Sequence, residues 1–405
     1  MTIQTWLSLA EAPGPCTSYG ELIHRFWPVA AVSFGLALLA TPVCRSIAIK
    51  CGIVDKPDAH LKPHQKPIPY LGGVAIFLGW AGGIGAALFF GENNGTEDAQ
   101  ARFPLMVGIA LAGLATMLIG LFDDLRVMPA RAKLLANIAV ALALLWMGLG
   151  DQLIQVVTDI MGVRFEPHER WLQLCYSVPI MLLIVVGACN ATNLIDGLDG
   201  LCTGVLGIIS IGFLLLATHL RAYEASPAGN ERIILALAML GAAVGFLPFN
   251  LNPAKIFMGD AGSMLLGLNA AIILLLFAEE HMIRWMMGAL MVFGLPIGDM
   301  LLTLARRWRN GRPLMQGDRS HFYDQLVDRG LTVKQVVVIS YLLTTAFVAV
   351  GTSVIFLRLR YAVLVYFVAF LATVAGIWKF DMAGIEEKRS PGENRDGPES
   401  DRAGV

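Results

Sequence analysis

Long runs of apolar residues constrain the fold of this chain more than any other feature. Eleven runs come close to the roughly 20 residues that a helix needs to cross a bilayer. Only 15% of the 405 residues are charged, against about 25% in soluble domains, and the mean hydropathy is +0.65. We therefore expect an all-α integral membrane protein with about 11 transmembrane helices. The predicted spans are 26–48, 70–90, 103–121, 133–149, 172–189, 201–219, 232–249, 262–278, 285–305, 335–356 and 360–379.

The Lys and Arg residues divide unevenly between the two sides of this arrangement. If the N-terminus lies outside, 21 of the 30 fall in inner loops and the C-terminal tail, and 9 fall in outer segments. Because positive residues favour cytoplasmic loops, we predict an outside N-terminus and a cytoplasmic C-terminus. Residues 1–380 are expected to form one polytopic membrane domain. Residues 381–405, rich in Glu, Arg, Gly and Pro, are expected to form a disordered cytoplasmic tail.

Charge and cysteine content give no support for a nucleic-acid partner, a disulfide framework or a zinc site. The formal net charge of −1 gives no argument for a nucleic-acid partner. The six cysteines contain no CxxC pair and fall mostly in or beside apolar runs, so they are interpreted as apolar fillers.

Unusual polar residues gather at the ends of predicted spans, all on the side assigned as cytoplasmic. Ionisable groups at membrane depth are costly and are functional candidates. The first cluster is Asp123 and Asp124, which close the third span. Adjacent carboxylates repel, so one pKa should rise unless a cation is shared. The pair could also be no more than a solvated loop start.

The second cluster lies between Asn190 and Gly200, where two apolar spans are joined. Its glycines let the backbone approach a ligand, and a simple turn would not need so many polar groups. Its polar members are Asn190, Asn193, Asp196 and Asp199.

Two further clusters follow in the second half of the chain. The third contains Asn250, Phe257 and Asp260, and could instead represent an interfacial aromatic residue and a helix N-cap. The fourth is the loop 306–334, with several arginines and His321. The arginines could serve only to set the topology.

Several carboxylates and basic groups around one aqueous pocket suit Mg²⁺-assisted chemistry on a diphosphate. Mg²⁺ takes oxygen ligands, usually one or two carboxylates plus substrate phosphates. Phosphoryl transfer depends on positioning and charge neutralisation more than on covalent chemistry by the protein.

At these motifs the sequence closely resembles the polyprenyl-phosphate N-acetylhexosamine-1-phosphate transferases. The resemblance runs from Gly52 to about Gly330. Its marks are Gly52-Ile-Val-Asp55, the segment from His64 to Gly73, the Asp123-Asp124 pair, the run from Asn193 to Asp199, Met258-Gly259-Asp260 and the loop around His321.

The resemblance implies a role for each matched residue. Asp260 would be the principal Mg²⁺ ligand, with Mn²⁺ as a possible substitute. Asp123 and Asp124 would activate the lipid phosphate or help to bind the metal, and His321 would begin the catalytic loop motif. The remaining residues would bind substrate: Lys66 the diphosphate, Asn193 and Asp196 the nucleotide-diphosphate pocket, Asp199 and Asn250 the nucleotide side, Phe257 the uracil ring, and Asn190 a part of the substrate that is not specified.

The implied reaction transfers a HexNAc-1-phosphate, most simply GlcNAc-1-phosphate, from a UDP-sugar to undecaprenyl phosphate with release of UMP. It would be the first membrane step of a cell-envelope glycan pathway such as lipopolysaccharide or teichoic acid synthesis. The enzyme would lie in the bacterial inner (plasma) membrane, among membrane lipid, with a cytoplasmic active site and possible homodimers. Direct attack by the lipid phosphate is favoured over a covalent enzyme intermediate.

The sequence departs from the family at Tyr323 and Asp324, where many relatives have histidines. This departure leaves the sugar specificity open. The three consecutive histidines typical of lipid I-forming translocases are absent, which favours a GlcNAc-type substrate over the muramyl-pentapeptide.

Two further functions are compatible with an apolar chain of this kind. The first is a transporter, whose carboxylates would lie mid-membrane in repeated halves. Here the carboxylates lie at the ends of predicted spans and no internal repeat is visible, which disfavours transport. The second is a catalytically inactive relative that acts as a scaffold, and the presence of every carboxylate named above argues against it.

Overall fold

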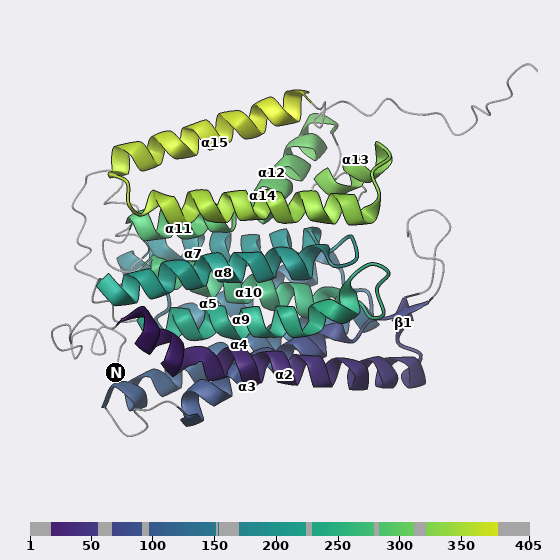
Figure 1. Ribbon diagram of the computed structural model, residues 1–405, viewed down its shortest axis with the longest axis horizontal. Coiled ribbons are helices and arrows are strands. Elements are labelled where there is room, and N and C mark those ends of the chain that lie inside the picture. The colour runs from purple at the N-terminus through teal and green to yellow at the C-terminus, as the bar shows by residue number, and fades with distance from the viewer. Residues whose placement is uncertain are drawn as a thin grey trace, which may run out of the picture.

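The computed structural model describes residues 18–55, 67–90, 97–150, 153, 170–223, 229–278, 283–311 and 321–379. Within these ranges each predicted apolar run corresponds to one helix or, for the run 285–305, to a pair of helices (Figure 1). The longer helices of the first half are α2 (Tyr19–Cys51), α3 (Gly72–Phe90), α4 (Glu97–Leu125), α5 (Ala130–Trp146), α7 (Arg170–Leu194) and α8 (Leu201–Tyr223). Those of the second half are α9 (Gly229–Asn250), α10 (Gly259–Phe277), α11 (Ile283–Val292), α12 (Gly294–Arg309), α14 (Val333–Val354) and α15 (Leu359–Lys379).

Helix length and composition fit a multi-pass membrane protein. In the described ranges, nine helices are long and apolar enough to cross a bilayer, and the bent pair α11 and α12 brings the number to ten. The remaining predicted run, 133–149, corresponds to α5, which has only 17 residues. At 1.5 Å per residue such a helix is about 25 Å long, a little less than the hydrocarbon core. The all-α class is confirmed, apart from a ribbon of two short strands.

One predicted span is not a continuous helix. The apolar run 285–305 predicts a single crossing helix, but it breaks at Phe293 and its two halves meet at 70°. Pro296 is the third residue of α12. Proline has no backbone N–H to donate and is tolerated in a first turn, where that donor would have no helical acceptor.

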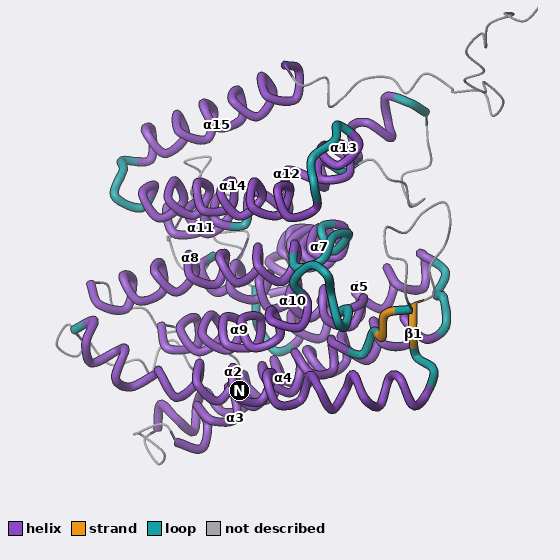
Figure 2. The backbone as a smooth tube through the Cα atoms, turned by 45° about the vertical axis from the view of Figure 1, so that its right-hand side comes forward, coloured by secondary structure: helices purple, strands orange, loops and turns teal. Residues whose placement is uncertain are grey.

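The buried centre of the bundle is α10, whose residues from Ala261 to Phe277 are all buried. It packs against α3, α4, α7 and α9. Figures 1 and 2 both place α15 on the far side of the bundle from α2 and α3. Small residues permit close helix contact, since an added Cβ at Gly79 would meet the backbone of Ser33 on α2. This agrees with the close packing expected for Gly-rich spans in lipid.

Short elements complete the described chain. The strands β1 (Val54–Asp55) and β2 (Ile68–Pro69) pair antiparallel, with Val54 opposite Pro69. Helix α13 (Phe322–Asp328) precedes α14. Lys66 and the tail 381–405 lie outside the described residues, so their predicted roles and the proposed division at 380 stay predictions.

Candidate active site

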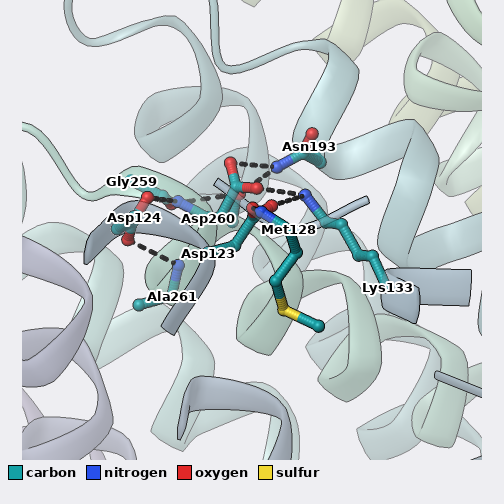
Figure 3. Close-up of polar contacts among 9 residues, drawn as sticks. Asp123, Asp124, Met128, Lys133, Asn193, Gly259, Asp260 and Ala261 are labelled. Carbon is teal, nitrogen blue, oxygen red and sulfur yellow. Dashed lines mark hydrogen bonds and ion pairs between the residues drawn. The ribbon is translucent and has the colours of Figure 1, made fainter. Parts of the chain in front are cut away.

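Four helix ends bring polar side chains together at one end of the bundle. Asp123 and Asp124 lie in the last turn of α4, Lys133 in the first turn of α5, Asn193 in the last turn of α7 and Asp260 in the first turn of α10. Figure 3 shows the side chains of Asp123, Lys133, Asn193 and Asp260 pointing toward one another, whereas the carboxylate of Asp124 points to the backbone at the start of α10. Three of the four predicted clusters therefore contribute to the same region. Their predicted positions at span ends on one side of the membrane agree with this arrangement.

Lys133 links two carboxylates that are far apart in sequence. Its Nζ lies 3.0 Å from Asp123 Oδ2 and also forms an ion pair with Asp260 Oδ2 (Figure 3). The other oxygen of Asp260 accepts a hydrogen bond of 2.7 Å from Asn193 Nδ2, which also lies 3.1 Å from Ser263 Oγ. Asp260 is thus held from two sides.

Asp124 has different partners from its neighbour Asp123. Its Oδ1 accepts a hydrogen bond of 2.9 Å from the backbone N–H of Asp260, and its Oδ2 accepts one of 3.2 Å from Ala261. Asp123 instead accepts a hydrogen bond of 2.6 Å from the backbone N–H of Met128 and pairs with Lys133. The repulsion expected between adjacent carboxylates is relieved because the two side chains point to different donors.

Backbone hydrogen bonds fix the segment that precedes Asp260. Pro69 O accepts from Phe257 N at 2.9 Å, and Gly72 N and Gly73 N donate to Phe257 O and Met258 O at 3.0 and 2.9 Å. An added Cβ at Gly73 would overlap the backbone of α10, so glycine is required for this approach. The segment after β2 therefore fixes the position of Phe257. The side chain of Phe257 is half-buried.

The loop between α7 and α8 carries two of the predicted acidic residues. Asp199 Oδ2 accepts hydrogen bonds of 2.9 Å from both Asn252 Nδ2 and the backbone N–H of Ala254.

The second acidic residue of this loop, Asp196, lies near Asp260 and Asp124. Loss of solvent, followed by repulsion from Asp260, Asp124 and Asp199, raises the pKa of Asp196 well above its ordinary value.

Two of the predicted asparagines are engaged within the protein. Asn250 is buried, and its Oδ1 accepts hydrogen bonds from Thr203 Oγ1 at 2.8 Å and from Gly200 N at 3.2 Å. Its Nδ2 donates to Ile256 O at 3.2 Å, so it joins the start of α8 to the turn before Phe257. Asn190 Nδ2 donates to Val186 O at 2.7 Å. The nucleotide contact of Asn250 and the substrate contact of Asn190 stay predictions.

His321 belongs to a separate buried group beside this region. Its Nδ1 lies 2.8 Å from Asp299 Oδ2 and 3.2 Å from Thr303 Oγ1, and Asp299 Oδ1 also accepts from Phe322 N at 2.9 Å. The imidazole stacks on Tyr323, with ring centroids 5.3 Å apart.

Tyr323 Oη donates to Leu194 O at 2.8 Å and so connects α13 to the end of α7. Burial is the main cause that raises the pKa of Tyr323 well above its ordinary value.

Comparison with known proteins identifies the family. Residues 106–278 match the family model described as glycosyl transferase family 4. The chain is 32% identical over 356 residues to the probable undecaprenyl-phosphate N-acetylglucosaminyl 1-phosphate transferase of Bacillus subtilis, covering 85% of this chain and 91% of the relative. The chain belongs to glycosyl transferase family 4. It is a glycosyl-1-phosphate transferase by family, which confirms the resemblance drawn from the motifs.

Further family 4 relatives differ in the sugar that their names give. The undecaprenyl-phosphate alpha-N-acetylglucosaminyl 1-phosphate transferase of Yersinia pestis is 30% identical over 338 residues, covering 82% of each chain. The phospho-N-acetylmuramoyl-pentapeptide-transferase of Chlorobium luteolum is 30% identical over 366 residues, covering 84% of this chain and 94% of the relative. Membership of family 4 thus fixes the class of reaction more closely than the donor.

The donor set fits a magnesium ion that is bound together with substrate. Among the residues that the structure describes, no three His, Cys, Asp or Glu side chains are grouped closely enough to hold a metal by themselves. However, Asp123 and Asp260 both reach the Nζ of Lys133, so both can reach one cation. Two carboxylates plus substrate phosphates are a common ligand set for Mg²⁺.

Two charged residues of the region are not singled out by the sequence patterns. Lys133 counts there only among the residues that set topology, and no local pattern relates it to Asp260, 127 residues away. Asp299 lies inside the apolar run 285–305, and a carboxylate within a span is a signal that could have found it. Only Lys133 needs the packed helices to be recognised.

Proposed function

We propose that this family 4 enzyme transfers GlcNAc-1-phosphate from UDP-GlcNAc to undecaprenyl phosphate in a Mg²⁺-dependent reaction on the cytoplasmic side of the membrane. The observation that carries the proposal is the convergence of Asp123, Lys133, Asn193 and Asp260 at the ends of four helices. The acceptor and sugar are those in the names of the Bacillus subtilis and Yersinia pestis relatives.

In the proposed reaction, an oxygen of the lipid phosphate attacks the phosphorus that bears the sugar. The bond from that phosphorus to the oxygen of the UMP phosphate breaks, giving undecaprenyl-diphosphate-GlcNAc and UMP. Asp123 takes the proton of the lipid phosphate where that phosphate is protonated, and Lys133 neutralises charge on the diphosphate. A bound Mg²⁺ would supply further neutralisation of the phosphate oxygens. No covalent enzyme intermediate is needed.

The remaining residues position the donor. Asn193 holds one oxygen of Asp260, which leaves the other oxygen directed toward Lys133 and the phosphates. Phe257 offers a ring for the uracil, and Asp196 and Asp199 lie on the same loop for contacts to the nucleotide. Tyr323 connects this loop region to the segment that contains His321.

The test is a transfer assay with purified protein, undecaprenyl phosphate, Mg²⁺ and a panel of UDP-sugars, with release of UMP as the readout. We expect release with UDP-GlcNAc that needs both the lipid and the metal. Turnover only with UDP-MurNAc-pentapeptide would replace the proposal with lipid I formation, in line with the Chlorobium luteolum relative. No release with any donor would favour the inactive scaffold.

A further inference from the structure

The first turn of α10 lacks a capping side chain of its own. Its N-cap residue is Met258, which makes no side-chain cap hydrogen bond. The first N–H groups of a helix have no partner within the helix and are normally satisfied by the side chain at the N-cap. Here the amides of Asp260 and Ala261 both donate to Asp124, a residue of α4.

The charge of Asp124 suits this position. A carboxylate is stabilised at a helix N-terminus, where the aligned peptide dipoles are positive, and is disfavoured at the C-terminal end of a helix. Asp124 lies in the last turn of α4, so its own helix does not stabilise it. Figure 3 shows it beside Gly259 and Ala261, on the opposite side of the Asp260 backbone from Lys133.

The surrounding backbone is shaped to admit the carboxylate. Gly259 has φ 66°, and an added Cβ there would overlap the carboxylate of Asp124. Gly120 lies one turn before Asp124 on α4, and an added Cβ there would meet Asp260 and Ala261 backbone atoms at 2.5 Å. In addition, Tyr70 Oη donates to the backbone oxygen of Asp124 at 2.8 Å. These contacts hold the end of α4 directly against the start of α10.

We infer that Asp124 is a positioning residue, which caps α10 from the neighbouring helix and so places Asp260, while Asp123 alone of the pair faces the reacting groups. This assignment rests on the proposed function for the role of Asp260, and it divides a pair that the sequence treats as equivalent. The carboxylate of Asp124 has both oxygens held by amides of α10, whereas that of Asp123 pairs with the ammonium of Lys133.

The inference predicts different effects for the two neutral variants. Asp124→Asn keeps one acceptor for the two amides, so we expect a partial loss of kcat, a higher Mg²⁺ concentration at half-maximal rate and a nearly unchanged KM for UDP-GlcNAc. Asp124→Ala removes both acceptors and should lose more. Asp123→Asn should lower kcat by at least about a hundredfold, the scale of a lost general base.

Hydrogen exchange tests the cap without relying on catalysis. In the purified protein, Asp124→Asn should speed amide exchange in residues 259–263 by about fivefold, the scale of one lost cap. Asp123→Asn should leave exchange in this segment unchanged. Unchanged exchange in both Asp124 variants would overturn the cap. The exchange measurement still tests whether Asp124 caps α10 if the wild-type protein has no transfer activity. Absence of transfer activity would contradict only the proposed function.

A double-mutant cycle tests whether the cap is the route by which Asp124 acts. Gly259→Ala inserts a methyl group where the Asp124 carboxylate lies, so its loss of kcat should overlap with that of Asp124→Asn and multiply with that of Asp123→Asn. Gly52→Ala is the matched control, since Gly52 has φ 70° but no heavy atom within 4 Å of an added Cβ. Losses for Asp124→Asn and Gly259→Ala that multiply fully would assign Asp124 to substrate or metal instead.

Discussion

The individual carboxylates of this site have different hydrogen-bond and ion-pair partners. Asp123 and Asp260 share the ammonium of Lys133, whereas Asp199 accepts hydrogen bonds from Asn252 and Ala254. Asp196 lies close to three carboxylates, which adds to the effect of burial in raising its pKa. The same residue type therefore supplies two carboxylates paired with Lys133, a carboxylate that supports a loop and a carboxyl group that resists ionisation.

The charge of Asp260, and not only its shape, should be essential for catalysis. Asp260→Asn keeps an oxygen that can accept from Asn193 but loses the ion pair with Lys133. We expect kcat to fall by at least about a hundredfold, the scale for removing one preorganised electrostatic group. UMP release at saturating Mg²⁺ measures the effect, and thermal unfolding checks that the variant is folded. A near-normal rate would exclude Asp260 from the proposed Mg²⁺ site.

Phe257 should contribute to binding of the nucleotide. Its backbone is held by Pro69 and Gly72, so replacing the ring leaves the segment in place. Phe257→Ala should weaken UDP-sugar binding by about 1–3 kcal/mol, the range for stacking of a base on an aromatic ring, with little change in the KM for the lipid. Phe122→Ala is the control, since Phe122 is an exposed aromatic residue at the end of α4. Equal losses for both substrates would indicate an interfacial role only.

Asp196 should make the stability of the ligand-free protein depend on pH. Its folded pKa is raised, so the folded state binds more protons than the unfolded state between the two pKa values. The free energy of unfolding therefore falls as pH rises from the unfolded pKa through the folded pKa. Asp196→Asn should therefore raise the Tm at pH above the folded pKa, with a smaller gain toward about pH 4, the unfolded value. A Tm gain that is the same at both pH values would contradict this account. Because the proposed function places Asp196 at the nucleotide, turnover by Asp196→Asn should also fall.

At the level of elements, loops distant in sequence are joined by single hydrogen bonds. Tyr323 on α13 donates to Leu194 at the end of α7, and its ring lies where a Cβ on Gly197 would be. Asp299 on α12 accepts from His321 and from Phe322 N, which fixes the start of α13. Movement of the segment around His321 would therefore displace the loop that carries Asp196 and Asp199.

Replacing the hydroxyl of Tyr323 should loosen this connection. Tyr323→Phe removes the hydrogen bond to Leu194 and keeps the ring that stacks on His321. We expect a loss of about 0.5–1.5 kcal/mol in kcat/KM, the range for one hydrogen bond. Tyr323→His introduces the residue that the family resemblance implies at this position, and it should in addition change the kcat/KM ratio between UDP-GlcNAc and the remaining UDP-HexNAc donors. An unchanged ratio would limit Tyr323 to supporting the loop.

The sequence predicts helices more completely than it predicts their contacts. Apolar runs mark spans because the lipid core requires satisfied backbone groups, and in the described residues each run corresponds to one helix or to the bent pair α11 and α12. The break at Phe293 escapes prediction because the run 285–305 is apolar on both sides of it. Lys133 escapes it because its pairing with Asp260 depends on how α5 packs beside α10, which no local pattern records.

Across the whole molecule, the polar groups of the candidate site converge at one end of an apolar bundle built around α10. The site residues come from the last turns of α4 and α7 and the first turns of α5 and α10, so all four helices meet at the same surface. A soluble donor and a lipid acceptor could both reach such a surface, whereas a transporter would need its polar groups near mid-membrane. The arrangement therefore favours transfer at the membrane interface.

The last prediction concerns which side of the membrane this end faces. The uneven distribution of Lys and Arg predicts that the segment around His321 is cytoplasmic, as a UDP-sugar donor would require. Asp328 and Arg358 are exposed residues beyond opposite ends of α14, so a single cysteine at each position reports opposite sides. In a variant whose native cysteines are replaced by serine, Arg358→Cys should react with an impermeant maleimide on intact cells, and Asp328→Cys should react only after permeabilisation. Transfer activity of each variant is the control for native folding. Labelling of Asp328→Cys but not Arg358→Cys on intact cells would invert the topology and move the proposed site to the outer face.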